Sequence, residues 1–257
     1  MTSDLPDPDQ PIFIAADLLD HKRGLGLLPD VPPPESVILA FQRSLVDYVT
    51  RRHPTKRVGG FHGDLFLFKR TQGRVGLMGN FGLGSPVTAA LVDELAAFGV
   101  KRFLVVGLAG GLQPELGPGD LVLCNRAMRG EGASGHYLPA GQWVDGSQEM
   151  AQGLGRALDE REARYTLGST WTTDAPFREL RRVALAHQQA GVSTVEMEAA
   201  ALFAVAQATN TSALAAFVVA DTLANGRWQM AGDHKKMERG LQVLFDAVLD
   251  YLAARQA

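Results

Sequence analysis

The chain has 257 residues, 46% hydrophobic and 21% charged, which is enough apolar sequence for one large α/β domain with a buried core. Its net charge of −3 gives no basic footprint for nucleic acid, and no apolar run approaches the ~20 residues of a membrane span. The single cysteine, Cys124, excludes an intramolecular disulfide, and the N-terminus shows no signal-peptide pattern. We therefore expect a cytoplasmic protein that binds neither nucleic acid nor membrane.

Residues 1–10 are rich in Asp and Pro, and we predict a flexible N-terminal arm followed by a single domain over residues 11–257. Short apolar runs that end at turn signals predict strands, and apolar residues that recur every three or four positions predict helices. The predicted strands, in chain order, cover residues 11–16, 64–69, 74–78, 102–106, 121–125, 165–169, 193–195 and 213–220. The predicted helices cover about 35–49, 87–98, 148–161, 177–189, 197–208 and 234–254. This alternation predicts an α/β fold with a mostly parallel sheet covered on both faces.

Two glycine-rich segments, residues 79–84 and 107–111, follow predicted strands. Glycine lets backbone amides approach an anion, but neither segment has the spacing of a dinucleotide-binding loop, and both also fit tight strand-to-helix turns. Ligands gather at the carboxyl ends of strands in such folds. Residues 170–177, 195–198 and 221–228 follow strands as well, so these segments together predict one site.

Glu196 and Glu198 lie two residues apart where a predicted strand meets an Ala-rich helix. Carboxylates at such a junction suit the hydroxyls of a sugar, although acidic residues are also favoured in the first turn of any helix. Asp221 ends another apolar strand, where burial would let it donate a proton to a leaving group; the alternative is a turn cap.

Four large side chains are candidates to stack on a flat ligand, and each is also compatible with a place in the core. They are Trp171, Phe177, Met197 and Trp228. The six histidines do not fall at metal-ligand spacings, so we expect no metal site.

Taken together, these segments resemble the uridine phosphorylase branch of the nucleoside phosphorylase family. The similar residues are Gly82-Leu83-Gly84-Ser85-Pro86, Glu94-Leu95, Gly107 to Gly111, Gln113-Pro114, Gly119-Asp120, Gly132-Ala133-Ser134, His136 and Pro139. Glu196-Met197-Glu198-Ala199-Ala200 is similar to the sugar-binding signature of that family.

The resemblance implies a single-domain three-layer α/β/α sandwich around a mixed, partly barrel-like sheet. It also implies cleavage of the N-glycosidic bond of a nucleoside, with no cofactor beyond inorganic phosphate as co-substrate, by a homo-oligomer (dimer or hexamer). Glu198 would bind the ribose hydroxyls and Met197 would pack against the sugar, with Glu196 beside them. Asp221 would be the catalytic acid toward a purine-like base.

The base would also meet Phe177, Trp171 and Gly110, and Arg178 is the candidate to replace the Gln and Arg that read uracil in the family. The departures from the family concern phosphate. The usual Gly-Asp-Pro-x-Arg loop is missing from residues 14–23, where Arg23 or Lys22 is the candidate substitute, at a different spacing. Val105 and Leu108 stand where an Arg and a hydroxyl residue are expected.

Gly82, Gly84 and His62 complete the candidate phosphate contacts, since His62 aligns near an Arg usually lent by a neighbouring subunit. Replacing bidentate Arg contacts by apolar residues weakens phosphate binding. Three hypotheses follow: phosphorolysis to free base and (deoxy)ribose 1-phosphate, which the resemblance favours; a nucleosidase that uses water; and a non-catalytic nucleoside-binding protein.

Overall fold

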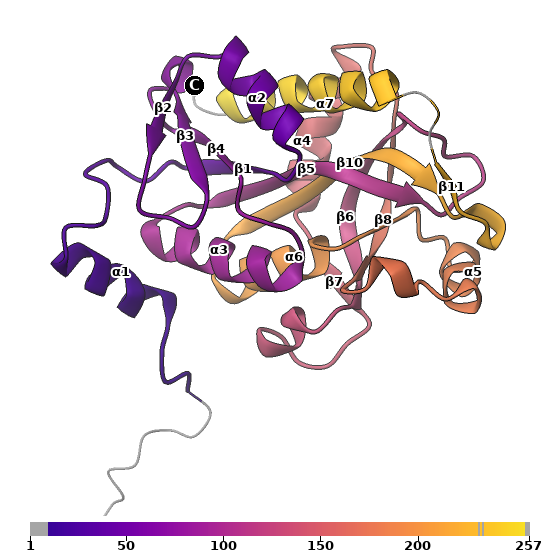
Figure 1. Ribbon diagram of the computed structural model, residues 1–257, viewed down its shortest axis with the longest axis horizontal. Coiled ribbons are helices and arrows are strands. Elements are labelled where there is room, and N and C mark those ends of the chain that lie inside the picture. The colour runs from indigo at the N-terminus through magenta and orange to yellow at the C-terminus, as the bar shows by residue number, and fades with distance from the viewer. Residues whose placement is uncertain (1–9, 231, 233, 255–257) are drawn as a thin grey trace, which may run out of the picture.

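Helices surround a mixed sheet of eleven strands in the computed structural model, which describes residues 10–230, 232 and 234–254 (Figure 1). The predicted flexible arm therefore lies outside the described residues, apart from residue 10. The strands are β1 (Ser36–Ala40), β2 (Thr55–Val58), β3 (Asp64–Phe68), β4 (Val75–Gly79), β5 (Arg102–Gly111), β6 (Leu121–Gly130), β7 (Trp143–Asp145), β8 (Tyr165–Thr173), β9 (Thr194–Glu196), β10 (Ser212–Thr222) and β11 (Gln229–Met230). The α-helices are α1 (Ala15–Gly24), α2 (Arg43–Arg52), α3 (Ser85–Phe98), α4 (Gln148–Asp159), α5 (Arg181–Gln189), α6 (Ala199–Ala208) and α7 (His234–Ala254). Short 3₁₀ turns are η1 (Lys69–Thr71), η2 (Ala133–His136), η3 (Pro176–Arg178) and η4 (Ala224–Gly226).

The sheet closes on itself at one end. The strand order is β11-β10-β6-β8-β9-β5-β1-β4-β3-β2, and β10 also pairs with β5, so β5, β10, β6, β8 and β9 form a closed ring. β10 runs parallel to β5 and antiparallel to β6, and its register on β5 shifts between Val219 and Asp221. This arrangement confirms the expected mixed, partly barrel-like sheet.

Two helical layers cover the sheet, with α3 and α6 on one face and α2, α4 and α7 on the other (Figure 1). Alternation along β1 shows the two cores, because Val37 and Leu39 pack on the α3/α6 side while Ile38 and Ala40 pack on the opposite side. Helix α6 is buried along nearly its whole length. No helix in the described part of the chain has both the length and the apolar character to span a membrane.

Three predicted elements were wrong. Residues 11–16 form no strand; the chain instead enters α1 at Ala15, where Asp17 accepts a hydrogen bond from the Ile14 amide at 3.0 Å. The segment expected as a helix from residue 35 is β1 followed by α2, because Val37 to Ala40 are buried from both sides. Residues 107–111 are no turn, since β5 continues through them.

Candidate active site

Glu198 is held at the start of α6, just after β9 ends at Glu196. Its residue is only 6% exposed, and its Oε1 accepts a hydrogen bond from the Gly84 amide at 2.7 Å. Gly84 has a φ of 94°, in a region that favours glycine, so the turn before α3 presents this amide without strain. Oε2 accepts from the Met197 amide at 3.3 Å. A carboxylate has about four acceptor sites, which leaves capacity for the hydroxyls of a ligand.

Glu196 serves the fold at the same junction. Its Oε2 accepts from the backbone amides of Glu198 and Ala199, both at 2.8 Å, and its Oε1 accepts from the Thr172 hydroxyl at 2.6 Å. The side chain thereby caps the first turn of α6, the role that the sequence offered as the alternative to sugar binding. Glu196 also lines the cavity described below, so a ligand contact stays a prediction.

The two carboxyls influence each other's ionisation. Burial raises the pKa of Glu196, and the negative charge of Glu198 raises it further. Burial also raises the pKa of Glu198, against the effect of the amides of Gly84 and Met197, which favour its ionised form.

A cavity of about 630 Å³ leads from this junction to the end of β10. Met197 and Asp221 both line it, and Asp221 Oδ2 accepts a hydrogen bond from Trp228 Nε1 at 2.6 Å. Phe177 and Trp228 line the same cavity and are 98% and 65% exposed, so their rings are free to cover a flat ligand. The structure thus brings Met197, Phe177, Trp228 and Asp221 together, as the sequence predicted.

Gly110 lies in a strand and not in a turn, and it lies close to Asp221 and Leu223. It lies within β5 opposite Asp221 of β10, and it lines the cavity. A Cβ at this position would stand 2.6 Å from Leu223 Cδ1 and 3.1 Å from Asp221 Oδ1. A larger residue at this position would have to displace the end of the Leu223 side chain and would crowd the Asp221 carboxyl.

Glu179, which sequence reasoning missed, also lines the cavity. Burial raises its pKa to about 7, with a further contribution from the charge of Asp221. The signal available in the sequence was its place two residues after Phe177, in the segment where the family reads its base.

Two predicted base contacts lie elsewhere in the structure. Trp171 is buried in a cluster of apolar residues, where its ring meets His187 with centroids 4.6 Å apart. Arg178 is exposed at the end of η3 and does not line the cavity. Their roles as ligand contacts stay predictions.

The candidate phosphate residues are scattered. Gly82 and Gly84 lie in the turn before α3, whereas Arg23 lies on α1 and forms an ion pair with Asp20. His62 lines a separate hollow of about 700 Å³ with residues such as Phe13. These positions are not brought together around one point of the cavity.

The segment compared with the phosphate loop of the family, residues 14–23, does not line the cavity either. Residues 14–23 belong to the region of α1, which is outside the sheet. The loop that leaves the carboxyl end of β1 begins at Phe41, whose ring stacks edge-on with Phe81 at a centroid distance of 5.0 Å. Val105 is buried in the α3/α6 core, and Leu108 lines the cavity. Of these residues only Leu108 lines the cavity, and its side chain cannot donate a hydrogen bond to a phosphate.

The charge of the cavity follows from its lining. Among the described residues that line it, the ionisable side chains are Glu179, Glu196 and Asp221, and none is Arg, Lys or His. A dianion gains no electrostatic stabilisation from such a surface. The described residues also contain no group of three or more His, Cys, Asp or Glu side chains that could hold a metal ion.

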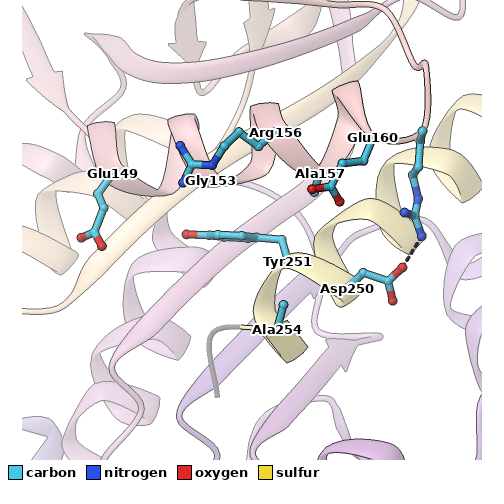
Figure 2. A pocket seen from close by; sticks show the side chains of 9 residues that line it. Glu149, Gly153, Arg156, Ala157, Glu160, Asp250, Tyr251 and Ala254 are labelled. Atoms are coloured by element: carbon cyan, nitrogen blue, oxygen red, sulfur yellow. Dashed lines mark hydrogen bonds and ion pairs between the residues drawn. The ribbon is translucent and has the colours of Figure 1, made fainter. Parts of the chain in front are cut away.

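A different hollow, of about 370 Å³, lies between α4 and α7 (Figure 2). Its charged residues include Arg161, which forms an ion pair with Asp250, and its floor is the ring of Tyr251 beneath Gly153. It shares no lining residue with the cavity of Met197 and Asp221. The convergent carboxyls and aromatic rings thus single out the latter as the candidate active site.

Proteins of known family are similar to this chain in sequence. It is 33% identical over 138 residues to a uridine phosphorylase from Thermococcus kodakarensis, covering 49% of this chain and 50% of that protein. It is 30% identical over 179 residues to a guanosine phosphorylase from Halorubrum lacusprofundi, covering 65% of this chain and 73% of that protein. The chain thus spans about half the length of the first of these relatives.

Solved structures share the fold. The structure of an AMP nucleosidase from Bacteroides thetaiotaomicron has a TM-score of 0.74 at 22% identity, covering 95% of this chain and 100% of that one. A purine nucleoside phosphorylase from Toxoplasma gondii in complex with immucillin-H has a TM-score of 0.76 at 18% identity, covering 88% and 94%. These likenesses confirm the predicted α/β fold.

The family model of the phosphorylase superfamily matches residues 37–253, which include every strand of the sheet apart from the first residue of β1. The sequence resemblance to nucleoside phosphorylases and the shared fold agree with this match. The chain therefore belongs to the phosphorylase superfamily.

Proposed function

We propose that this protein cleaves the N-glycosidic bond of a nucleoside. The observation that supports the proposal is one cavity lined by Glu196 and Met197, which directly precede Glu198, and by Asp221 near the end of β10. The curated relatives, named as uridine and guanosine phosphorylases, support the same reaction class.

The chemistry fits the two sides of the cavity. Breaking the bond from C1′ to the base leaves positive oxocarbenium character on the sugar and negative charge on the base. Glu198 would accept hydrogen bonds from the ribose hydroxyls and stabilise the sugar charge. Asp221 would donate a proton to the departing base, while Phe177 and Trp228 cover its faces.

We propose water as the nucleophile. The carboxyls of Glu179, Glu196 and Asp221 line the cavity without a cation among its described residues, and Leu108 of β5 lines it without a hydroxyl group. The water oxygen would bond to C1′ as the electron pair of the C1′–N bond leaves with the base, and the water would replace the proton that Asp221 gives away. Phosphorolysis is the second candidate, because the relatives similar in sequence are uridine and guanosine phosphorylases.

The test is to incubate the protein with purine and pyrimidine nucleosides in phosphate-free buffer and at several phosphate concentrations, and to identify the sugar released. We expect base release at a rate independent of phosphate, with free ribose as the product. Ribose 1-phosphate formed only with phosphate would instead establish phosphorolysis. A melting temperature that rises with nucleosides, without any base release, would establish a non-catalytic binding protein.

The predicted homo-oligomer, a dimer or a hexamer, stays a prediction, as does the cytoplasmic location. Sedimentation analysis would test the first and cell fractionation the second.

A further inference from the structure

The start of α3 contacts the residues just before α6, although the two segments are far apart in the sequence. Gly84 directly precedes α3, and Ser85 is the first residue of that helix. The Gly84 amide donates to Glu198 Oε1 at 2.7 Å, and the Ser85 hydroxyl donates to the Met197 carbonyl at 2.7 Å. Two adjacent positions of α3 therefore hold two adjacent residues before α6.

The peptide unit that joins Met197 to Glu198 is hydrogen-bonded on both of its sides. Its carbonyl accepts from the Ser85 hydroxyl, and its N–H, on Glu198, donates to Glu196 Oε2 at 2.8 Å. A peptide unit is planar, so bonds to its carbonyl and to its N–H fix its orientation and the place of the next Cα. The backbone of Glu198 is thus set by Ser85 and Glu196, and its carboxylate by Gly84.

The Ser85 hydroxyl differs from an ordinary helix cap. A serine at a helix start commonly accepts a hydrogen bond from an amide of its own helix, as Ser147 does from the Met150 amide before α4 at 3.2 Å. The Ser85 hydroxyl instead donates to another segment. Its residue is fully buried, where a hydroxyl is costly unless it is hydrogen-bonded. The contact with Met197 therefore accounts for a serine at this position.

We propose that Ser85 is a positioning residue for Glu198, whose hydroxyl holds the Met197–Glu198 peptide so that the carboxylate meets the hydroxyls of the sugar. This inference rests on the proposed nucleoside cleavage, in which Glu198 binds the ribose. It adds a residue that does not line the cavity and acts on the substrate only through the backbone.

The first experiment compares kcat/KM for guanosine and uridine, each beside its 2′-deoxy form, in the wild type, Ser85→Ala and Ser147→Ala. A ribonucleoside offers Glu198 two hydroxyls and a 2′-deoxynucleoside offers one, so a displaced carboxylate costs the ribonucleoside more. We expect Ser85→Ala to lower kcat/KM by about tenfold for the ribonucleoside, the scale of one hydrogen bond to a charged group, and by about threefold for the 2′-deoxy form.

Ser147→Ala is the matched control, because it also removes one serine hydrogen bond at a helix start. It should leave the ratio of ribonucleoside to 2′-deoxynucleoside at the wild-type value. Ser85→Cys keeps a weaker donor in nearly the same volume, and its ratio should lie between those of the wild type and Ser85→Ala. Equal losses on both sugars in Ser85→Ala would mean that Ser85 supports the fold in general, and would overturn the inference.

A double-mutant cycle with Glu198→Gln tests the route of the effect. If Ser85 acts through the charge of Glu198, Ser85→Ala should lower kcat/KM by less than about twofold in the Glu198→Gln protein, because the two changes remove the same interaction. A loss of about tenfold in that protein as well would contradict the inference, since Ser85 would then act independently of the carboxylate.

A measurement without nucleoside separates this inference from the proposed reaction. The Gly84 amide favours the ionised form of Glu198, whereas burial raises the pKa of this carboxyl. If Ser85→Ala lets Glu198 move away from Gly84, the pKa of Glu198 should rise further. Carbon NMR of protein labelled at the glutamate carboxyl carbons follows this titration, and the signal of Glu198 is the one that Glu198→Gln lacks.

The two proposals fail in different ways. A raised pKa of Glu198 in Ser85→Ala, without base release by the wild type, would support the positioning role and contradict nucleoside cleavage. An unchanged pKa would overturn the positioning role even if the wild type cleaves nucleosides. Melting curves establish that the variants are folded, and Ser85→Cys takes the place of Ser85→Ala in every comparison if the alanine variant does not fold.

Discussion

The proposed sugar end and the proposed base end of the site are built in different ways. At the proposed sugar end, Glu198 is buried beside the cavity-lining Met197, and it accepts hydrogen bonds from the backbone amides of Gly84 and Met197. At the base end, Phe177 and Trp228 are largely exposed and lie on or beside the short turns η3 and η4. Under the proposed function, the fold itself would fix the sugar contacts, whereas side chains on or beside short turns would contact the base.

The largest expected effect is at the sugar end. Glu198→Ala removes a charged acceptor for two hydroxyls, at about 1.5–3 kcal/mol for each hydrogen bond, so kcat/KM should fall by roughly 10³-fold. Glu160→Ala, in the hollow of Figure 2, removes the same charge outside the cavity and should leave kcat/KM unchanged. Steady-state kinetics on both variants makes the comparison, and a loss below tenfold for Glu198→Ala would place the sugar elsewhere.

A smaller effect is expected from the acid at the base end. Asp221→Asn should lower kcat for purine nucleosides by about 10²-fold, within the usual range for general acid catalysis. It should affect 4-nitrophenyl riboside much less, because nitrophenolate leaves without a proton. Equal losses on both substrates would show that Asp221 positions the base instead of protonating it.

The smallest effect concerns stability at the sugar end. Burial and the charge of Glu198 raise the pKa of Glu196 in the folded protein. A group with a raised folded pKa stabilises the fold fully below its unfolded pKa, and this contribution is lost as pH rises through the folded value. The wild-type melting temperature should therefore fall between pH 6 and pH 9.

Glu196→Gln cannot ionise, so its melting temperature should fall less over the same range, by about 2–4 °C for each kcal/mol of difference. Calorimetry at each pH measures the two curves. Parallel curves would mean that Glu196 does not titrate in this window.

Strong periodic segments of the fold were predictable, and the strand–helix junction at Met197 and Glu198 was among them. The helix expected from residue 35 was wrong because Val37 to Ala40 form a continuous apolar run, which suits a doubly covered strand as well as a helix. The turn expected at residues 107–111 was wrong because these residues continue β5, where Gly110 pairs with Asp221 of β10.

Much of the candidate site depends on contacts that no spacing reveals. Glu179 and Asp221 are separated by 41 intervening residues in the sequence, and only the folded chain brings them to one cavity. Trp171 was indistinguishable from Trp228 in the sequence, yet one is buried beside His187 and the other donates to Asp221. The sequence shows which side chains can stack on a ligand, but it does not show which of these aromatic rings are buried in the core.

The register shift in β10 has a consequence for how the chain tolerates insertions and deletions. Val219 pairs with Ala109 and packs in the α3/α6 core, while Asp221 pairs with Gly110, the very next residue of β5. In a regular strand, Asp221 would face the same side of the sheet as Val219, because side chains alternate. Ala220 is the extra residue of a β-bulge, and it reverses this alternation. The pairing register of β10 determines that Asp221 faces the cavity. Insertions or deletions in this part of β10 should therefore be rarer than substitutions.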